Sequence, residues 1–254
     1  MGKVIEGKKI ECLEDFVKAL NFYRKSRGIP WWRGQGISKW GLIPTLFREN
    51  NSDNEFELNI TFKRQARVRY EKCPDENDRT SWLFLMRHYG LPSRLLDWSE
   101  SPLTALFFAV EDEKDDSDGA LWSINPGELN EVFSGINPKG IFDCHDERVT
   151  KVIKDIPLSV SDKYLPPAGK KVLAIMSEHF DLRHLLQQAV FTLHESDMDL
   201  DKHEKADLFL IKFIIPAGAK SDLRRSLHYL GINRSTLFPD LDNLSTHLNQ
   251  MKWV

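Results

Sequence analysis

The chain has 254 residues, of which 41% are hydrophobic and 29% are charged, and its formal net charge at pH 7 is −3. These fractions are typical of a soluble globular protein, and the small negative charge argues against broad electrostatic attraction to nucleic acid or to an anionic membrane. No window approaches the roughly 18 apolar residues of a membrane span, and the N-terminal residues contain no apolar segment of signal-peptide length. The three cysteines include no CxxC pair, which is typical of reduced thiols. We therefore expect a cytoplasmic protein with no membrane partner.

The first part of the chain predicts an edge strand, a helix and a second strand. Residues 4–10 are compatible with a short edge strand, and apolar residues recur at helical spacing over residues 13–26. Residues 29–34 then predict a strand that ends in a glycine-rich turn. The spacing of these glycines is not that of a GxGxxG dinucleotide-binding loop, so the sequence does not predict a Rossmann fold.

Arg33 and Gly34 close this second strand and form the first candidate binding feature. A glycine lets backbone amides come close to a ligand, while the guanidinium offers paired hydrogen bonds to a phosphate or a carboxylate. The alternative is a structural or surface arginine. Gln35 follows directly and is a further polar candidate.

The next segment predicts two helices that lead to the most informative part of the chain. Residues 54–69 predict an exposed helix, and residues 81–89 predict a second helix after a polar loop. A basic face on the first of these helices is interpreted as a solvated surface. The residues of that face are Lys63, Arg64, Arg67 and Arg69.

The stretch from Arg87 to Val110 combines a turn, several polar groups and an apolar helix. Gly90 and Pro92 predict the turn, and the nearly all-apolar residues 102–110 predict a buried helix that Ser99 or Ser101 could cap. The stretch would therefore carry charged groups into contact with the core, where unpaired charge is costly. We expect Arg94 and Asp97 to form a buried ion pair that positions the loop behind Arg33, or, in the alternative interpretation, one that only holds a loop.

The remaining elements complete a predicted α+β fold in a single domain. Strands near residues 122, 174, 191 and 211 would join the strand near residue 30 in a mixed or antiparallel sheet, with the helix of residues 102–110 as its central support. Potential metal ligands occur at residues 143–147, but adjacent residues do not converge easily on one ion, and we expect no metal.

Four motifs give this sequence a family resemblance. HYGLPSRLLDWSESPLTALFFA (residues 88–109) closely resembles the central motif of the FRG-domain family. WWRGQ (31–35), QQAVFTL (187–193) and GINRSTLFPDLDNL (231–244) follow the order of that family. The resemblance implies a single FRG domain over residues 1–254, with a core at about 29–250 and the N-terminal helix packed on it. It also implies a role in bacterial defence.

The separated polar residues are similar, more remotely, to those of the ADP-ribosyltransferase superfamily. That similarity implies that Arg33 and Gly34 hold NAD, and that Gln188 or Glu195 stabilises the ribose as positive charge develops on it. The chain departs from the superfamily because it has no ExE or QxE pair on this strand. The remaining expected contributors to the NAD pocket are Gln35, His88, Tyr89, Arg94, Asp97 and Trp98.

Two functional hypotheses follow. The first is an NAD-dependent ADP-ribosyltransferase-like enzyme that cleaves the nicotinamide–ribose bond and transfers ADP-ribose to a protein, a nucleic acid or water. The second is a non-catalytic module that binds a phosphate-bearing ligand or nucleic acid through Arg33, Arg94 and Gln188. Hydrolases with a GxSxG motif and P-loop NTPases are disfavoured because neither motif occurs.

Overall fold

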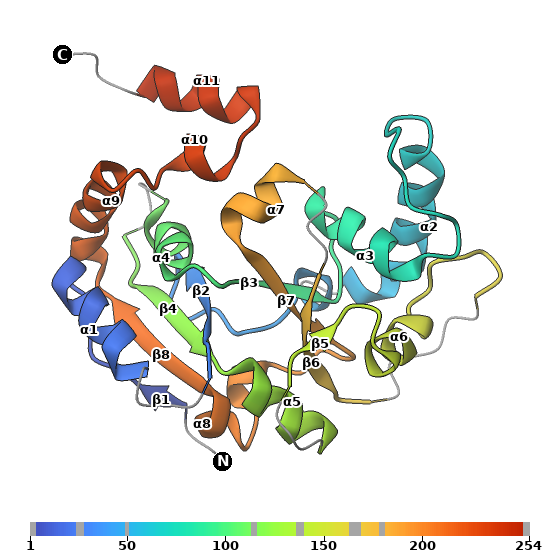
Figure 1. Ribbon diagram of the computed structural model, residues 1–254, viewed down its shortest axis with the longest axis horizontal. Coiled ribbons are helices and arrows are strands. Elements are labelled where there is room, and N and C mark those ends of the chain that lie inside the picture. The colour runs from blue at the N-terminus through green and yellow to red at the C-terminus, as the bar shows by residue number, and fades with distance from the viewer. Residues whose placement is uncertain are drawn as a thin grey trace.

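The computed structural model centres on a mixed sheet of eight strands (Figure 1). It describes residues 4–23, 28–48, 51–112, 116–135, 140–162, 169–177 and 181–250. The last residues of the helix predicted over residues 13–26 lie outside these ranges. So does Met251, near which we expect the end of a final helix that follows a turn at residues 238–241. The sheet and the helices around it confirm the predicted α+β class, with a mixed sheet.

The strands are arranged in the order β1-β8-β4-β2-β3-β7-β6-β5. The outermost pairs, β1 with β8 and β5 with β6, are parallel, whereas all pairs between them are antiparallel. All five predicted inner strands are present, and β3 was not predicted. The strands are β1 (Ile5–Glu6), β2 (Trp31–Gln35), β3 (Leu95–Ser99), β4 (Gly119–Ile124), β5 (Phe142–Asp143), β6 (Val172–Met176), β7 (Ala189–His194) and β8 (Leu210–Ile215).

Helices cover both faces of the sheet, and α1 and α4 begin at the residues that the sequence predicts. In α4 the Ser101 side chain accepts a hydrogen bond from the Thr104 N–H and Pro102 occupies the first turn, as the capping preferences of helices favour. None of the helices described is long and apolar enough to span a membrane. The helices are α1 (Leu13–Tyr23), α2 (Glu55–Ala66), α3 (Arg79–His88), α4 (Pro102–Val110), α5 (Pro126–Ser134), α6 (Glu147–Lys154), α7 (Leu182–Gln187), α8 (Ala206–Phe209), α9 (Lys220–Tyr229), α10 (Arg234–Leu237) and α11 (Leu241–Gln250).

Side chains alternate between the two faces of the sheet along each strand, and the two faces pack against different helices. On one face, Trp31, Trp98 and Val190 belong to a single apolar cluster that also includes residues of α5 and α8. On the other face, Trp32 packs with residues of α1, α4 and α9. Phe191 lies in a separate cluster with residues of α3 and α6. Figure 1 shows these two groups of helices on opposite sides of the molecule, so that the second face is divided at its middle.

The division coincides with the pairing of β2 and β3. These strands share a single paired position within the described chain, Trp32 with Ser99, whereas β2 pairs with β4 along its whole length. Helix α4 packs against β2 and closes one side of the resulting gap. The approach is very close at Gly34, where an added Cβ would lie 2.6 Å from Ala109 N and closer still to Ala105 O. Gly34 therefore serves backbone-to-backbone packing of the buried central helix.

Helix α2 corrects one expectation. It was predicted to be exposed with a solvated basic face, and Arg64, Arg67 and Arg69 are exposed. Lys63 is instead buried, and its Nζ donates to Leu158 O at 3.0 Å and to Glu76 O at 3.3 Å. Asn59, one turn earlier, is also buried and its Nδ2 donates to Pro157 O at 2.9 Å. The helix thus turns polar side chains inward because backbone carbonyls of the segment after α6 accept from them.

Substitution Gly34→Ala is expected to lower the free energy of unfolding by about 3 kcal/mol or more, because the new methyl group meets helix backbone that cannot rotate away. Gly218→Ala is the matched control, since an added Cβ there meets nothing within 4 Å. Urea denaturation of both variants measures the effect. Equal stabilities for the two variants would contradict the packing role of Gly34.

Candidate functional site

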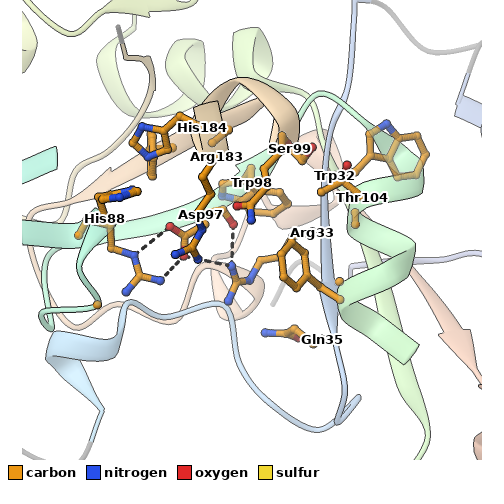
Figure 2. Close-up of a pocket in the computed structure, with 18 of the residues that line it drawn as sticks. Trp32, Arg33, Gln35, His88, Asp97, Trp98, Ser99, Thr104, Arg183 and His184 are labelled. Carbon is orange, nitrogen blue, oxygen red and sulfur yellow. Dashed lines mark hydrogen bonds and ion pairs between the residues drawn. The ribbon is translucent and has the colours of Figure 1, made fainter. Parts of the chain in front are cut away.

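A cleft of about 960 Å³ opens where the second face of the sheet is divided. Its walls come from β2, β3, β7 and α4, from the end of α3 and from the start of α7. Figure 2 shows Arg33, Asp97, His88 and Arg183 pointing into this region from four different elements. The cleft therefore gathers charged residues that are far apart in sequence.

Arg33 reaches across the gap between β2 and β3. Its Nη1 donates to Asp97 O at 2.6 Å and lies 3.9 Å from Asp97 Oδ2. Its Nε is buried and has no hydrogen-bond partner among the described residues. Burial lowers the pKa of Arg33 to about 10, partly offset by Asp97 and reinforced by Arg87 and Arg48. Arg33 remains charged at neutral pH, next to other cations.

Asp97 is held chiefly by Arg87, which the sequence analysis did not select. Arg87 Nε donates to Asp97 Oδ1 at 2.9 Å, and Arg87 Nη2 pairs with Oδ2. Burial favours the neutral form of Asp97, but Arg87 and Arg33 outweigh it and lower the pKa of the carboxyl to about 2. The Asp97 side chain is 38% exposed, so an ionised carboxylate faces the cleft.

Arg94 is not part of this arrangement, and the predicted Arg94–Asp97 pair is wrong. Arg94 Nε and Nη2 donate to the two oxygens of Glu55, at 2.7 and 2.6 Å, and Nη1 donates to Glu195 O at 3.0 Å. Both side chains of the Arg94–Glu55 pair are 3% exposed. Residues three apart point to opposite sides of a strand, so the extended conformation of β3 separates Arg94 from Asp97.

Gln35 and Trp98 line the cleft, but their polar atoms bond within the protein. Gln35 Oε1 accepts from Trp122 Nε1 at 2.7 Å, and its Nε2 donates to Gly41 O at 3.2 Å. Trp98 Nε1 donates to Thr192 Oγ1 at 3.0 Å. Trp98 thus uses its single donor and Gln35 uses one of its two amide N–H groups, so these residues chiefly shape the wall of the cleft.

Gln188 and Glu195 stand at the two ends of β7 and are not among the residues that line the cleft. Gln188 is exposed and ends α7 in a left-handed conformation, with φ 45° and ψ 51°. Glu195 Oε2 accepts from the Lys171 N–H at 3.0 Å at the other end. The neighbouring Gln187 does line the cleft, where its Nε2 donates to Leu237 O at 3.0 Å.

His88 and Tyr89 line the cleft together with residues at the start of α7, which were not among the predicted site residues. His88 Nε2 lies 2.7 Å from Asp181 Oδ2, and the rings of His88 and His184 are 5.2 Å apart. Burial lowers the pKa of His184 to about 4 and also lowers that of His88, so both rings are neutral at pH 7. Tyr89 is 56% exposed. The sequence feature that could have identified these residues is the polar segment from Asp181 to His184, just before the QQAVFTL motif.

Residues 29–118 match the family model of the FRG domain. The chain carries an FRG domain. The match includes Arg33, Arg87 and Asp97, whereas Asp181 and Arg183 of the same cleft lie beyond it. No curated protein and no solved structure was found to match this chain. Extension of the FRG domain to about residue 250 remains a prediction, as do the NAD-contact roles of the individual residues.

The buried pair of the FRG domain gives a stability prediction. Glu55→Ala is expected to lower the free energy of unfolding by about 3–5 kcal/mol, because it leaves the Arg94 guanidinium buried without its counter-charge. Glu14→Ala is the control, since its pair with Lys18 is exposed and screened by solvent. Chemical denaturation compares them, and a loss below about 1 kcal/mol for Glu55→Ala would be inconsistent with the pair.

The Asp97 carboxylate gives a pH prediction. Since the pKa of Asp97 falls from 3.8 to about 2 on folding, its stabilisation is complete above 3.8 and is lost as the pH falls towards 2. At neutral pH, Asp97→Asn is expected to cost about 1 kcal/mol, allowing for solvent screening. The difference in the free energy of unfolding between the wild-type protein and Asp97→Asn should shrink as the pH falls from 3.8 towards 2. A difference that is constant across the window would exclude the ion pair as its source.

Proposed function

We propose that the cleft of this FRG domain binds NAD and that the protein is an NAD-dependent ADP-ribosyltransferase-like enzyme, which cleaves the nicotinamide–ribose bond. The observation that carries the proposal is the convergence of four guanidinium groups on one cleft with aromatic walls. The four arginines are Arg33, Arg48, Arg87 and Arg183.

The clustered cations support an anionic ligand. Arg48 and Arg87 both lower the pKa of Arg33, which means that the three charges repel one another. Asp97 offsets this repulsion in part. A pyrophosphate carries two negative charges and accepts the paired hydrogen bonds that guanidinium groups offer, so its binding would relieve the remaining repulsion.

The apolar part of the cleft supports a ligand with flat rings. Trp32 and Phe108 line it beside the charged groups, and Trp40, which is 48% exposed, stands at its edge. NAD has an aromatic base at each end of the molecule, joined through a ribose to the central pyrophosphate. Aromatic side chains offer faces on which such rings stack.

The proposed reaction needs a negative charge beside the ribose. Departure of neutral nicotinamide leaves positive charge on the sugar, which a carboxylate stabilises before an acceptor adds. Asp97 supplies an ionised carboxylate inside the cleft, so we assign to it the role that the sequence analysis gave to Gln188 or Glu195. The acceptor would be a protein, a nucleic acid or water.

A non-catalytic module that binds a phosphate-bearing ligand is the second candidate. It is favoured by the position of Gln188 and Glu195 outside the lining of the cleft, and by the engagement of both Asp97 oxygens with Arg87. In this case the same arginines bind the ligand and no bond is cleaved. The two candidates share a binding site and differ only in turnover.

Calorimetric titration with NAD, followed by an assay for released nicotinamide, distinguishes the candidates. Arg33→Gln is expected to weaken NAD binding by about 10- to 100-fold, because hydrogen bonds from a charged group contribute about 1.5–3 kcal/mol. Arg64→Gln is the control, since Arg64 is an exposed cation outside the cleft. Binding with nicotinamide release that Asp97→Asn abolishes supports the enzyme.

Binding without release supports the module. Failure of the wild-type protein to bind NAD at millimolar concentration contradicts NAD as the ligand. If Arg33→Gln and Arg64→Gln weaken NAD binding equally, the cleft is not the NAD-binding site.

A further inference from the structure

We propose that His88, Asp181 and His184 form a binding site for one divalent transition-metal ion, of which Zn²⁺ is the representative, on the wall of the cleft. This inference goes beyond NAD binding and does not depend on it. It also departs from the expectation of no metal, which considered only the ligands near residue 144.

The ligand atoms are already close together. One nitrogen of each histidine and one oxygen of Asp181 all lie within 4.8 Å of one another, and His88 Nε2 is 2.7 Å from Asp181 Oδ2. Bonds of about 2.0–2.2 Å in a tetrahedral zinc site place ligand atoms about 3.3 Å apart. The widest separation would therefore shorten by at most about 1.5 Å, and the His88–Asp181 separation would lengthen by about 0.6 Å, to bring all three atoms to bonding distance.

The folding of α7 orients two of these ligands. Asp181 is the N-cap of the helix, and its Oδ1 accepts from the His184 N–H at 2.9 Å. This hydrogen bond directs the other oxygen, Oδ2, towards His88 at the end of α3. Hydrogen bonds that hold a ligand in place in this way are typical of metal sites.

Packing holds the two imidazole rings as well. The His184 ring contacts Phe191 edge-on, with centroids 5.8 Å apart, and it meets the His88 ring at an interplanar angle of 69°. The Tyr89 ring also packs against His88, with centroids 4.9 Å apart. Figure 2 shows His88 and His184 together at one end of the cleft.

The types of ligand in the site favour one class of metal ion, and their number leaves a coordination position without a protein ligand. Two imidazoles and one carboxylate suit Zn²⁺, Mn²⁺, Fe²⁺, Co²⁺ or Ni²⁺, whereas Ca²⁺ and Mg²⁺ prefer oxygen ligands. All three residues line the cleft, so a further ligand would approach a bound ion from the cleft. Three protein ligands with one open position are typical of sites that bind water or a ligand group, rather than of structural zinc sites.

Nearby charges both oppose and favour a cation. Arg183 acts electrostatically on both histidines and is the opposing charge on the same helix. The carboxylates of Asp97, Asp181 and Asp240 each raise the pKa of Arg183, so they offset part of its positive charge. The carboxylates around Arg183 thus limit its repulsion of a metal ion.

The test is calorimetric titration of the full chain with ZnCl₂ after treatment with a chelator and in the absence of NAD. We expect one ion per chain, a rise in the Tm on binding, and a Co²⁺ visible spectrum typical of nitrogen and oxygen ligands. Asp181→Asn retains the N-cap, because asparagine also accepts the N–H, but it removes the charge. It is expected to weaken binding by more than about tenfold, and His88→Gln should do the same.

His228→Gln is the matched control. His228 is exposed on α9 outside the cleft, and its ring lies 5.7 Å from that of His247, so this pair is the competing surface site. Binding that His228→Gln leaves unchanged and Asp181→Asn weakens supports the proposal. Absence of Zn²⁺ and Co²⁺ binding would show that His88 and Asp181 form only a hydrogen bond. Loss of binding in His228→Gln alone, or a sulfur-to-cobalt band from a cysteine site, would also overturn it.

Discussion

The cleft depends on the ion pair between Asp97 and Arg87, with Arg33 beside it. The three residues belong to β3, α3 and β2, and they meet where β2 and β3 have ceased to pair. Strands that diverge leave backbone groups without ladder partners, and Arg33 satisfies one of them by donating to Asp97 O. The same contacts that hold the divided sheet together therefore concentrate charge at the floor of the cleft.

Much of the fold could be predicted from local patterns, and the errors occurred where partners are distant in sequence. The cap and the apolar run of α4 are local signals, so the buried central helix was confirmed. Strand β3 was missed because its short run carries a charged residue in its middle. The partner of Arg94 was assigned to Asp97, three residues away, whereas Glu55 lies 39 residues earlier at the start of helix α2. Spacing along the chain does not report which elements become neighbours.

The candidate site was predicted in part for the same reason. Arg33, His88 and Asp97 were selected, and the structure brings all three to one cleft. Arg87 and the α7 residues were missed, because their importance arises only when the end of α3 meets the start of α7 beside β3. Gln188 and Glu195 were expected at the two ends of one strand and do flank β7, but neither lines the cleft.

The glycine contact of the central helix has a mechanical consequence. Helix α4 rests directly on the backbone of β2 at Gly34, so this wall of the cleft has no side-chain layer in which to shift. The opposite wall includes α7, a short helix whose Leu182 and Leu185 are more than half exposed. Helix α7 is held instead through side chains, since Ser99 Oγ donates to Gln187 O at 2.6 Å and Gln187 Nε2 donates to Leu237 O at 3.0 Å. The two walls of the cleft are therefore supported in different ways, one by direct backbone contact and the other by side-chain hydrogen bonds.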